Sequence, residues 1–380
     1  MDMTIRYTSF SEKSLLLMQK LLFSNTFFED EFTAPQNSIL SHLTRHFIPL
    51  QLHYLSCLLC DQESPLLALA PEEGYYDHLK KQGLTPPPYT LLEERAQIQT
   101  TLFSWGPSSG LSLWAKKTNC LYDIPKLSLV QKIQSKEFCF LHTPRPQGSM
   151  QITDESELRS WWSSTLGPKV LKTLYGSSGR GHFVSYKDGE IEQAAAFFHR
   201  NHNISSSYIA EPWVDRELDF STQWFLSLDG SISYLGVTLC ENSQRGIYKK
   251  SIVGPEKLLF PKHHSFLQEH LAHAQVLLKK IQSLGFFGPI GLDSFIYRSL
   301  NGSLHLLPIV EINARRTMGW AALKMQEKLY PNALCSLQYS TKKQEGSHFL
   351  PDFALHSNGY KIPLPAQLSF KKISSNNYPP

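Results

Sequence analysis

The chain has 380 residues, of which 41% are hydrophobic and 12% aromatic, and its formal net charge is only +4. This apolar content excludes an intrinsically disordered chain and is sufficient for two or three domains. Because no lysine- or arginine-rich block accompanies the small charge, the sequence indicates no nucleic-acid partner.

The sequence also indicates no membrane partner. No apolar stretch reaches the length of a membrane span, and the first residues, MDMTIRYTSFSEK, lack the basic and apolar segments of a signal peptide. The six cysteines are scattered, and the pair in CLLC at 57–60 has no second pair to complete a zinc site. We therefore expect a cytoplasmic protein in which these cysteines pack in a core.

The first 125 residues alternate apolar runs with turn-rich stretches, of which LTPPPYT at 84–90 is a clear break. The run IPLQLHYLSCLLC at 48–60 fits either a buried strand or a buried helix. SWGPSSG at 104–110 predicts a tight loop, and a structural role is favoured over a chemical one.

A different pattern begins near Pro125. LSLVQKIQSKEFCFLH at 127–142 predicts one helix, because apolar residues recur along one face and the lysines lie off it. After the break PRPQG, MQIT at 150–153 predicts a short strand. Asp154 with Glu157 three residues later predicts a capping box for a helix at 157–166.

A glycine-rich turn then joins two predicted strands. KVLKTLY at 169–175 and HFVSY at 182–186 predict a hairpin whose tip is GSSGRG at 176–181. The turn matches neither the P-loop GxxxxGK[ST] nor the Rossmann GxGxxG. Its glycines allow backbone N–H groups to approach an anion, and Lys172 on the preceding strand can reach the same charge. The alternative is a flexible tip beside a surface lysine.

The stretch EPWVDRE at 211–217 predicts a polar connection between two strands. A purine ring bound beside it would use backbone N–H and C=O groups, and a following carboxylate would bind ribose hydroxyls. Taken alone, however, this stretch fits an acidic loop better than a binding site.

The most informative segment is a predicted hairpin formed by GLDSFIYR at 291–298 and LHLLPIVEIN at 304–313 around a tight turn. Glu311 and Asn313 lie two residues apart and therefore point to one face, and pairing through the turn would bring Asp293 opposite Glu311. Three oxygen ligands on one face suit Mg²⁺. The alternative is a structural ion pair with Arg315 or Arg316.

In this order, two lysines, a glycine-rich hairpin, a glutamate-containing connector and an Asp…Glu-x-Asn hairpin resemble the ATP-grasp superfamily. The resemblance covers residues 126–320. Its most specific part is EINAR at 311–315, which is similar to the metal-binding E-x-N-x-R of many ATP-grasp ligases. Two positions depart from the family: the connector reads EPWV where a lysine is common, and Gly291 stands where some peptide-forming members have an arginine.

The resemblance implies a nucleotide site. Lys132, with Lys136 as its competitor, would be the first lysine that binds the nucleotide, and Lys172 the second. Glu211 and Val214 would lie at the adenine and Glu217 at the ribose. The loop that closes over the phosphates would contain Gly176, Ser177, Ser178, Gly179 and Gly181.

The resemblance also implies a metal and catalytic site. Asp293, Glu311 and Asn313 would bind Mg²⁺, for which Mn²⁺ could substitute. Arg315 and Lys172 would be the catalytic residues, with Arg315 on the acylphosphate oxygens and Arg316 in a structural ion pair.

The implied fold is an N-terminal α/β domain at 1–125, followed by two α+β subdomains at 126–208 and 209–340 that clamp ATP, and a C-terminal tail at 341–380. The implied activity is ligation: ATP phosphorylates a small carboxylate, and an amine, less often a thiol, displaces phosphate to form a C–N or C–S bond. Homodimers are common in such a family. The alternatives are a phosphotransferase without ligation and a non-enzymatic nucleotide-binding regulator.

Two further stretches carry weaker expectations. ENSQRGIYKKS at 241–251 is either a substrate loop, through Arg245, Lys249 and Lys250, or a solvated loop. The histidines of a predicted helix at 264–281 match no HExxH motif and are expected at the surface or an edge.

Overall fold

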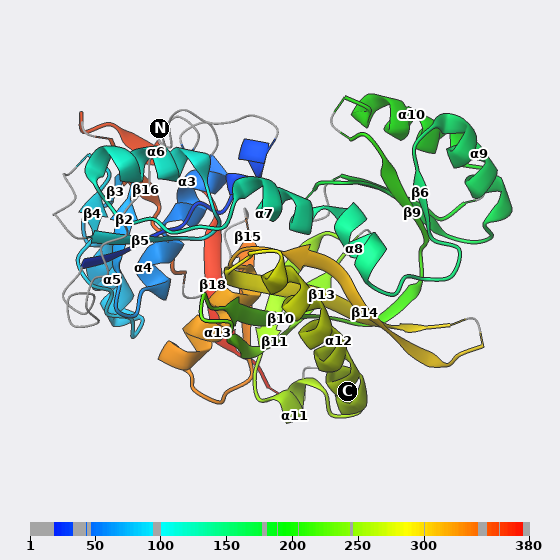
Figure 1. Ribbon diagram of the computed structural model, residues 1–380. Coiled ribbons are helices and arrows are strands. Elements are labelled where there is room, and N and C mark those ends of the chain that lie inside the picture. The colour runs from blue at the N-terminus through cyan, green and yellow to red at the C-terminus, as the bar shows by residue number, and fades with distance from the viewer. Residues whose placement is uncertain are drawn as a thin grey trace.

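The computed structural model describes residues 19–32, 43, 47–93, 100–176, 181–187, 189–203, 205–243, 246–299, 301–340, 348–356 and 358–374. The N-terminal elements lie at the left of Figure 1, a small four-stranded sheet at the right, and a larger sheet between them. The expected mixed fold, with an α/β part followed by two α+β parts, is confirmed.

The N-terminal part is built on a parallel sheet. Its strand order is β4-β2-β1-β5, formed by Thr90–Leu91, Ser64–Leu67, Gln19–Phe23 and Thr100–Ser104. The helices of this part are α3 (Phe47–His53), α4 (Leu55–Leu59), α5 (Tyr75–Lys81) and α6 (Ser109–Thr118). The run at 48–60 is therefore helical, and both cysteines of CLLC are buried as expected.

The four-stranded sheet carries the glycine-rich turn. Its order is β6-β9-β7-β8, formed by Met150–Ile152, Tyr208–Pro212, Lys169–Thr173 and His182–Ser185, and every pair is antiparallel. Helices α9 (Glu155–Ser164) and α10 (Ile191–Asn201) share its apolar core. One half of the predicted capping box is confirmed, because the Asp154 side chain accepts from the Glu157 backbone N–H. The Glu157 carboxylate accepts instead from the backbone N–H and hydroxyl of Thr153.

The central sheet has seven antiparallel strands, in the order β14-β13-β10-β11-β12-β15-β18. They are Leu304–Asn313, Gly288–Arg298, Asp215–Leu226, Ile232–Asn242, Tyr248–Val253, Cys335–Ser340 and Gln367–Lys372. The predicted hairpin is confirmed as β13–β14. Helix α12 (His264–Ser283) packs on this hairpin, α13 (Met318–Leu329) packs on β11 and β12, and the short α11 (Glu256–Leu259) lies beside β11.

Residues 348–356 and 358–374 are part of the folded body. Strand β18 pairs with β15 along six residues, while β16 (Phe353–Leu355) pairs with β17 (Lys361–Pro363) and with β3 (Ala70–Pro71) of the N-terminal part. Leu368 and Phe370 lie in a core shared by the parallel sheet, α13 and β15. The described part of the expected tail thus joins two parts of the molecule.

The prediction of one helix at 127–142 is wrong. The structure has two helices, α7 (Leu127–Gln134) and α8 (Lys136–His142), separated by the extended residue Ser135. The Ser135 hydroxyl accepts from the Phe138 backbone N–H and so caps α8. Because of this break, Lys132 and Lys136 do not lie one turn apart on the same helix face.

The histidine expectation is also wrong for His270, which is fully buried on α12. Its ring nitrogens lie 2.7 Å from the Thr222 hydroxyl and 2.6 Å from the Pro308 carbonyl oxygen, and burial lowers its pKa to about 4. Among the helices described, none is long and apolar enough to cross a bilayer.

Candidate active site

A pocket lies between the four-stranded sheet and the β10–β14 side of the central sheet. Many of the residues singled out in the sequence line it, from four separate parts of the chain: Lys136, Lys172, Gly176, Asp293, Glu311, Asn313 and Arg315. The first turn of α13 closes one end through Thr317, Met318 and Gly319.

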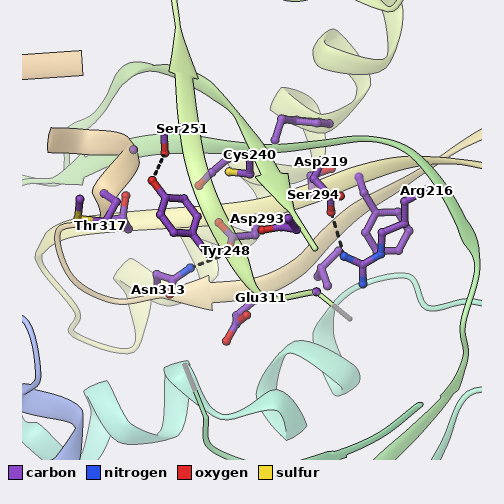
Figure 2. A pocket seen from close by; sticks show the side chains of 18 of the residues that line it. Arg216, Asp219, Cys240, Tyr248, Ser251, Asp293, Ser294, Glu311, Asn313 and Thr317 are labelled. Atoms are coloured by element: carbon purple, nitrogen blue, oxygen red, sulfur yellow. Dashed lines mark hydrogen bonds and ion pairs between the residues drawn. The ribbon is translucent and has the colours of Figure 1, made fainter. Parts of the chain in front are cut away.

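The acidic side of the pocket is the β13–β14 hairpin. Asp293 pairs with Glu311 and Gly291 with Asn313 in the strand register, so both carboxylates and the amide lie together. Figure 2 shows the Asn313 amide pointing to Asp293, and Nδ2 donates to Oδ2 at 3.0 Å. Two carboxylates and an amide are oxygen donors of the kind that Mg²⁺ accepts. The described residues contain no group of three or more His, Cys, Asp or Glu side chains that could hold a metal.

The pKa values of the two carboxylates are shifted in opposite directions. Burial and the nearby charge of Glu311 raise the pKa of Asp293 to about 6. Burial tends to raise the pKa of Glu311 as well, but Lys136 and Arg315 outweigh it and lower that pKa. A pair of neighbouring carboxylates favours a bound cation, because a cation would relieve the repulsion between their charges.

Of the two competing lysines, Lys136 reaches the pocket. Its Nζ lies 3.2 Å from Glu311 Oε1 and donates to the Gly176 carbonyl at 3.1 Å. Lys132 is exposed on α7 and does not line the pocket. The break at Ser135 produces this difference.

Lys172 is held by a buried network that the sequence did not indicate. Glu211 is 3% exposed, and its two oxygens are taken by Lys172 Nζ and by Arg145, whose Nε donates at 2.8 Å. Burial tends to raise the pKa of Glu211, but the two cations lower it to about 2. Glu211 therefore holds the Lys172 ammonium by an ion pair and does not itself line the pocket. Arg145 lies in PRPQG at 144–148, and no motif in the sequence indicated that it contributes to this site.

The connector is placed beside a second, larger pocket, which is lined by Val214 and shares Trp213, Arg216 and Asp219 with the first. Glu217 lines neither pocket and pairs with Arg298 at 2.8 Å. The acidic residue facing the site is instead Asp219, paired with Arg216 at 2.9 Å. The Arg216 guanidinium lies over the rings of Trp213 and Phe295, at 4.5 and 4.4 Å.

The two arginines after the hairpin have separate surroundings. Arg315 lines the pocket and pairs through Nε with Glu29 Oε1 at 2.7 Å. Arg316 does not form the ion pair that we expected within the described residues. It donates to the Ser104 carbonyl and lies 4.9 Å from the Trp320 ring centroid, and burial lowers its pKa to about 10.

The glycine-rich turn is described at its two ends only, and Ser177, Ser178 and Gly179 lie outside the described residues. Gly181 has a φ of +83°, and a Cβ there would lie 2.6 Å from Thr173 Oγ1. A larger residue would therefore be both strained and too close. Gly291 is similarly restricted, because a Cβ would lie 2.7 Å from Thr317 Cγ2, which leaves no room for an arginine.

Strands β11 and β12 present neutral side chains to the pocket. Tyr248, Ser251 and Cys240 line the pocket, and the Tyr248 and Ser251 hydroxyls are 2.9 Å apart (Figure 2). Lys249 and Lys250 do not line it, and Lys250 pairs with Glu241 at 2.8 Å. Arg245 lies outside the described residues. The expected contact of these two lysines with an anionic substrate in this pocket is therefore not found.

Comparisons with known proteins give a likeness of structure. No family model matches the sequence, and no curated protein matches it. Biotin carboxylase from Campylobacter jejuni, solved as a β,γ-ATP complex, superposes with a TM-score of 0.54 at 11% identity, over 95% of this chain and 89% of that one.

Two further enzymes superpose over nearly as much of this chain. The biotin carboxylase domain dimer of Hydrogenobacter thermophilus 2-oxoglutarate carboxylase, solved with MgADP, ADP and bicarbonate, gives a TM-score of 0.52 at 14% identity, over 93% of this chain and 86% of that one. Rhizobium etli pyruvate carboxylase, solved with acetyl coenzyme A, superposes with a TM-score of 0.55 at 12% identity, over 94% of this chain and 36% of that one. The superposed enzymes are ATP-grasp proteins, so this chain has the ATP-grasp fold.

Proposed function

We propose that this protein is an ATP-dependent ligase that activates a small carboxylate as an acylphosphate and joins it to an amine, or less often to a thiol. The observation that carries the proposal is the convergence of Asp293, Glu311 and Asn313 with Lys136 and Arg315 in one pocket of an ATP-grasp fold. A half-buried carboxylate pair opposite half-buried cations suits a polyphosphate and its counter-ion.

The residues of the pocket divide into two tasks. Lys136, Lys172 and the backbone of the glycine-rich turn would surround the phosphates of ATP, while the connector from Glu211 to Val214 would hold the adenine through main-chain groups. Asp293, Glu311 and Asn313 would hold Mg²⁺, which when bound would neutralise charge on the phosphates.

The reaction would consume one carboxylate, one amine and one ATP, and would release ADP and inorganic phosphate. A carboxylate oxygen of the substrate attacks the γ-phosphorus, the bond to the β,γ-bridging oxygen breaks, and ADP leaves. The amine nitrogen then attacks the acyl carbon, loses a proton and expels inorganic phosphate. Arg315 would face the oxygens that gain negative charge in both steps, since a guanidinium pairs well with carboxylate and phosphate.

The experiment that tests the function is ADP release from Mg·ATP by the purified protein, with and without a pool of amino acids, small carboxylic acids and bicarbonate. ADP and phosphate that depend on the pool and accompany a coupled product would support a ligase. A stable phosphorylated product would indicate a phosphotransferase. ATP binding without any turnover would contradict catalysis and indicate a nucleotide sensor.

Lys136→Ala is expected to weaken Mg·ATP binding by about 10- to 100-fold, because a charge-assisted contact contributes roughly 1.5–3 kcal/mol. Lys132→Ala is the matched control, since this lysine is exposed on the neighbouring helix, and its dissociation constant should stay within about twofold of the wild type. Equilibrium dialysis with labelled ATP measures both. The reverse order of effects would assign the nucleotide contact to Lys132.

A further inference from the structure

The N-terminal part contacts Arg315 of the pocket through a short 3-10 helix, FEDEF at Phe28–Phe32, which we call the FEDEF turn. Phe28 is 1% exposed and packs in the core formed by α7, α8, α12 and the β13–β14 hairpin. Its ring lies against Gly106, where a Cβ would come within 2.2–2.6 Å of the ring atoms. The turn is therefore fixed in a close-fitting position.

A second anchor is Glu31. Its carboxylate accepts from the Ser108 hydroxyl at 2.6 Å, from the Ser109 hydroxyl at 2.6 Å and from the Ser109 backbone N–H at 2.8 Å. These donors lie at the start of α6, where a negative charge is stabilised. The loop SWGPSSG thus holds the FEDEF turn, which supports the structural role expected for it.

Between these anchors, Glu29 meets the arginine of the pocket. Glu29 Oε1 accepts from Arg315 Nε and from Gln134 Nε2, both at 2.7 Å. Arg315 Nη1 also donates to the Arg316 carbonyl at 3.2 Å. Because a guanidinium is rigid and planar, these two contacts fix its plane and leave its other N–H groups for the pocket.

We propose that Glu29 is a positioning residue that holds Arg315 in its reactive orientation, so that the N-terminal part contributes directly to the chemistry. This inference rests on the proposed function, in which Arg315 faces the reacting oxygens. The side chain of Arg315 is only 15% exposed. Of the described carboxylates, Glu311 and Asp293 also attract its charge. Without Glu29 the guanidinium would therefore turn toward the metal-binding carboxylates and away from the acyl group.

Glu29→Ala is expected to lower kcat for pool-dependent ADP release at least about tenfold while KM for ATP stays within about twofold, because the lost contact orients a group that acts in the transition state. Glu29→Gln keeps an acceptor oxygen and should restore part of the rate. Glu31→Gln, in the same turn, is the control: it should lower the melting temperature but leave kcat near the wild-type value.

A spectroscopic readout tests the contact without any substrate. In the ¹⁵N-labelled full chain, the Nε–H signal of Arg315, assigned by its loss in Arg315→Lys, should be protected from exchange in the wild type and shifted and unprotected in Glu29→Ala. An unchanged signal in Glu29→Ala would overturn the proposal, as would equal losses of kcat in Glu29→Ala and Glu31→Gln.

If wild-type protein releases no ADP, the ligase proposal fails and the Arg315 signal alone decides the role of Glu29. If Glu29→Ala does not fold, Glu29→Gln takes its place, and an unchanged signal together with wild-type kcat in that variant would contradict the proposal.

Discussion

Glu311→Ala should abolish Mg²⁺-dependent ADP formation, with a loss of at least about a hundredfold in kcat, because it removes one of two carboxylates on the β13–β14 hairpin. The same change removes the partner of Lys136, which lies 3.2 Å from Glu311 Oε1. The fold should survive, since the Glu311 side chain is one-third exposed and lies at the pocket. Initial rates over a range of Mg²⁺ concentrations, with circular dichroism of the same sample, measure both effects.

Glu192→Ala is the matched control for this change. Glu192 is also half of an ion pair, with Arg159 at 2.7 Å, but its side chain is 73% exposed and lies on α10, away from the pocket. Its turnover should equal that of the wild type, since exposed pairs contribute little to stability. If Glu311→Ala turned over as fast as the control, Glu311 would not be a ligand of the catalytic metal.

The hairpin that carries the acidic residues could be predicted from the sequence because its signals are local. Apolar and polar residues that alternate with a period of two indicate the two strands. The turn residues between them fix the register closely enough to bring Asp293 opposite Glu311. The Glu-x-Asn spacing places Asn313 beside them for the same reason. None of these inferences requires knowledge of a distant part of the chain.

The choice between Lys132 and Lys136 could not be made from periodicity. The helix pattern continues across 127–142, and a serine inside such a pattern is compatible with helix. The backbone breaks at Ser135 because its hydroxyl caps the next helix, and the Lys136 backbone N–H bonds to the Leu174 carbonyl of the facing segment. This second contact is tertiary, so the local pattern does not contain it.

The supporting residues were missed for a related reason. Arg145 lies 66 positions before its partner Glu211 in the sequence. Glu29 lies 286 positions before its partner Arg315. Neither residue belongs to a spacing pattern, and each lies in a short irregular segment or a single turn. Ion pairs of this kind become visible only when the fold brings the segments together.

Asp293→Asn should stabilise the protein at pH 7.5 while it abolishes turnover. Burial and the charge of Glu311 raise the pKa of Asp293 to about 6, so the folded state disfavours its charged form. Removing that charge should increase the free energy of unfolding by about 1–3 kcal/mol, because the folded state then no longer holds an ionised carboxylate at this position. Urea unfolding in the presence of EDTA measures the gain, and ADP formation measures the loss.

The dependence of this gain on pH follows from the direction of the shift. A carboxyl whose pKa is higher in the folded state than in the unfolded state binds its proton more tightly when folded, so its ionisation destabilises the protein progressively as pH rises through about 6. The gain from asparagine should therefore be full at pH 7.5 and vanish near pH 4, where the wild-type carboxyl is protonated. Asp77→Asn is the control, because Asp77 is exposed and pairs with the equally exposed Lys80 at 3.3 Å. The free energy of unfolding of this variant should differ from that of the wild type by less than about 0.5 kcal/mol. A variant at position 293 that is less stable than the wild type at pH 7.5 would show that Asp293 contributes more through its contact with Asn313 than it costs through its buried charge, and that these residues need no cation to hold them together.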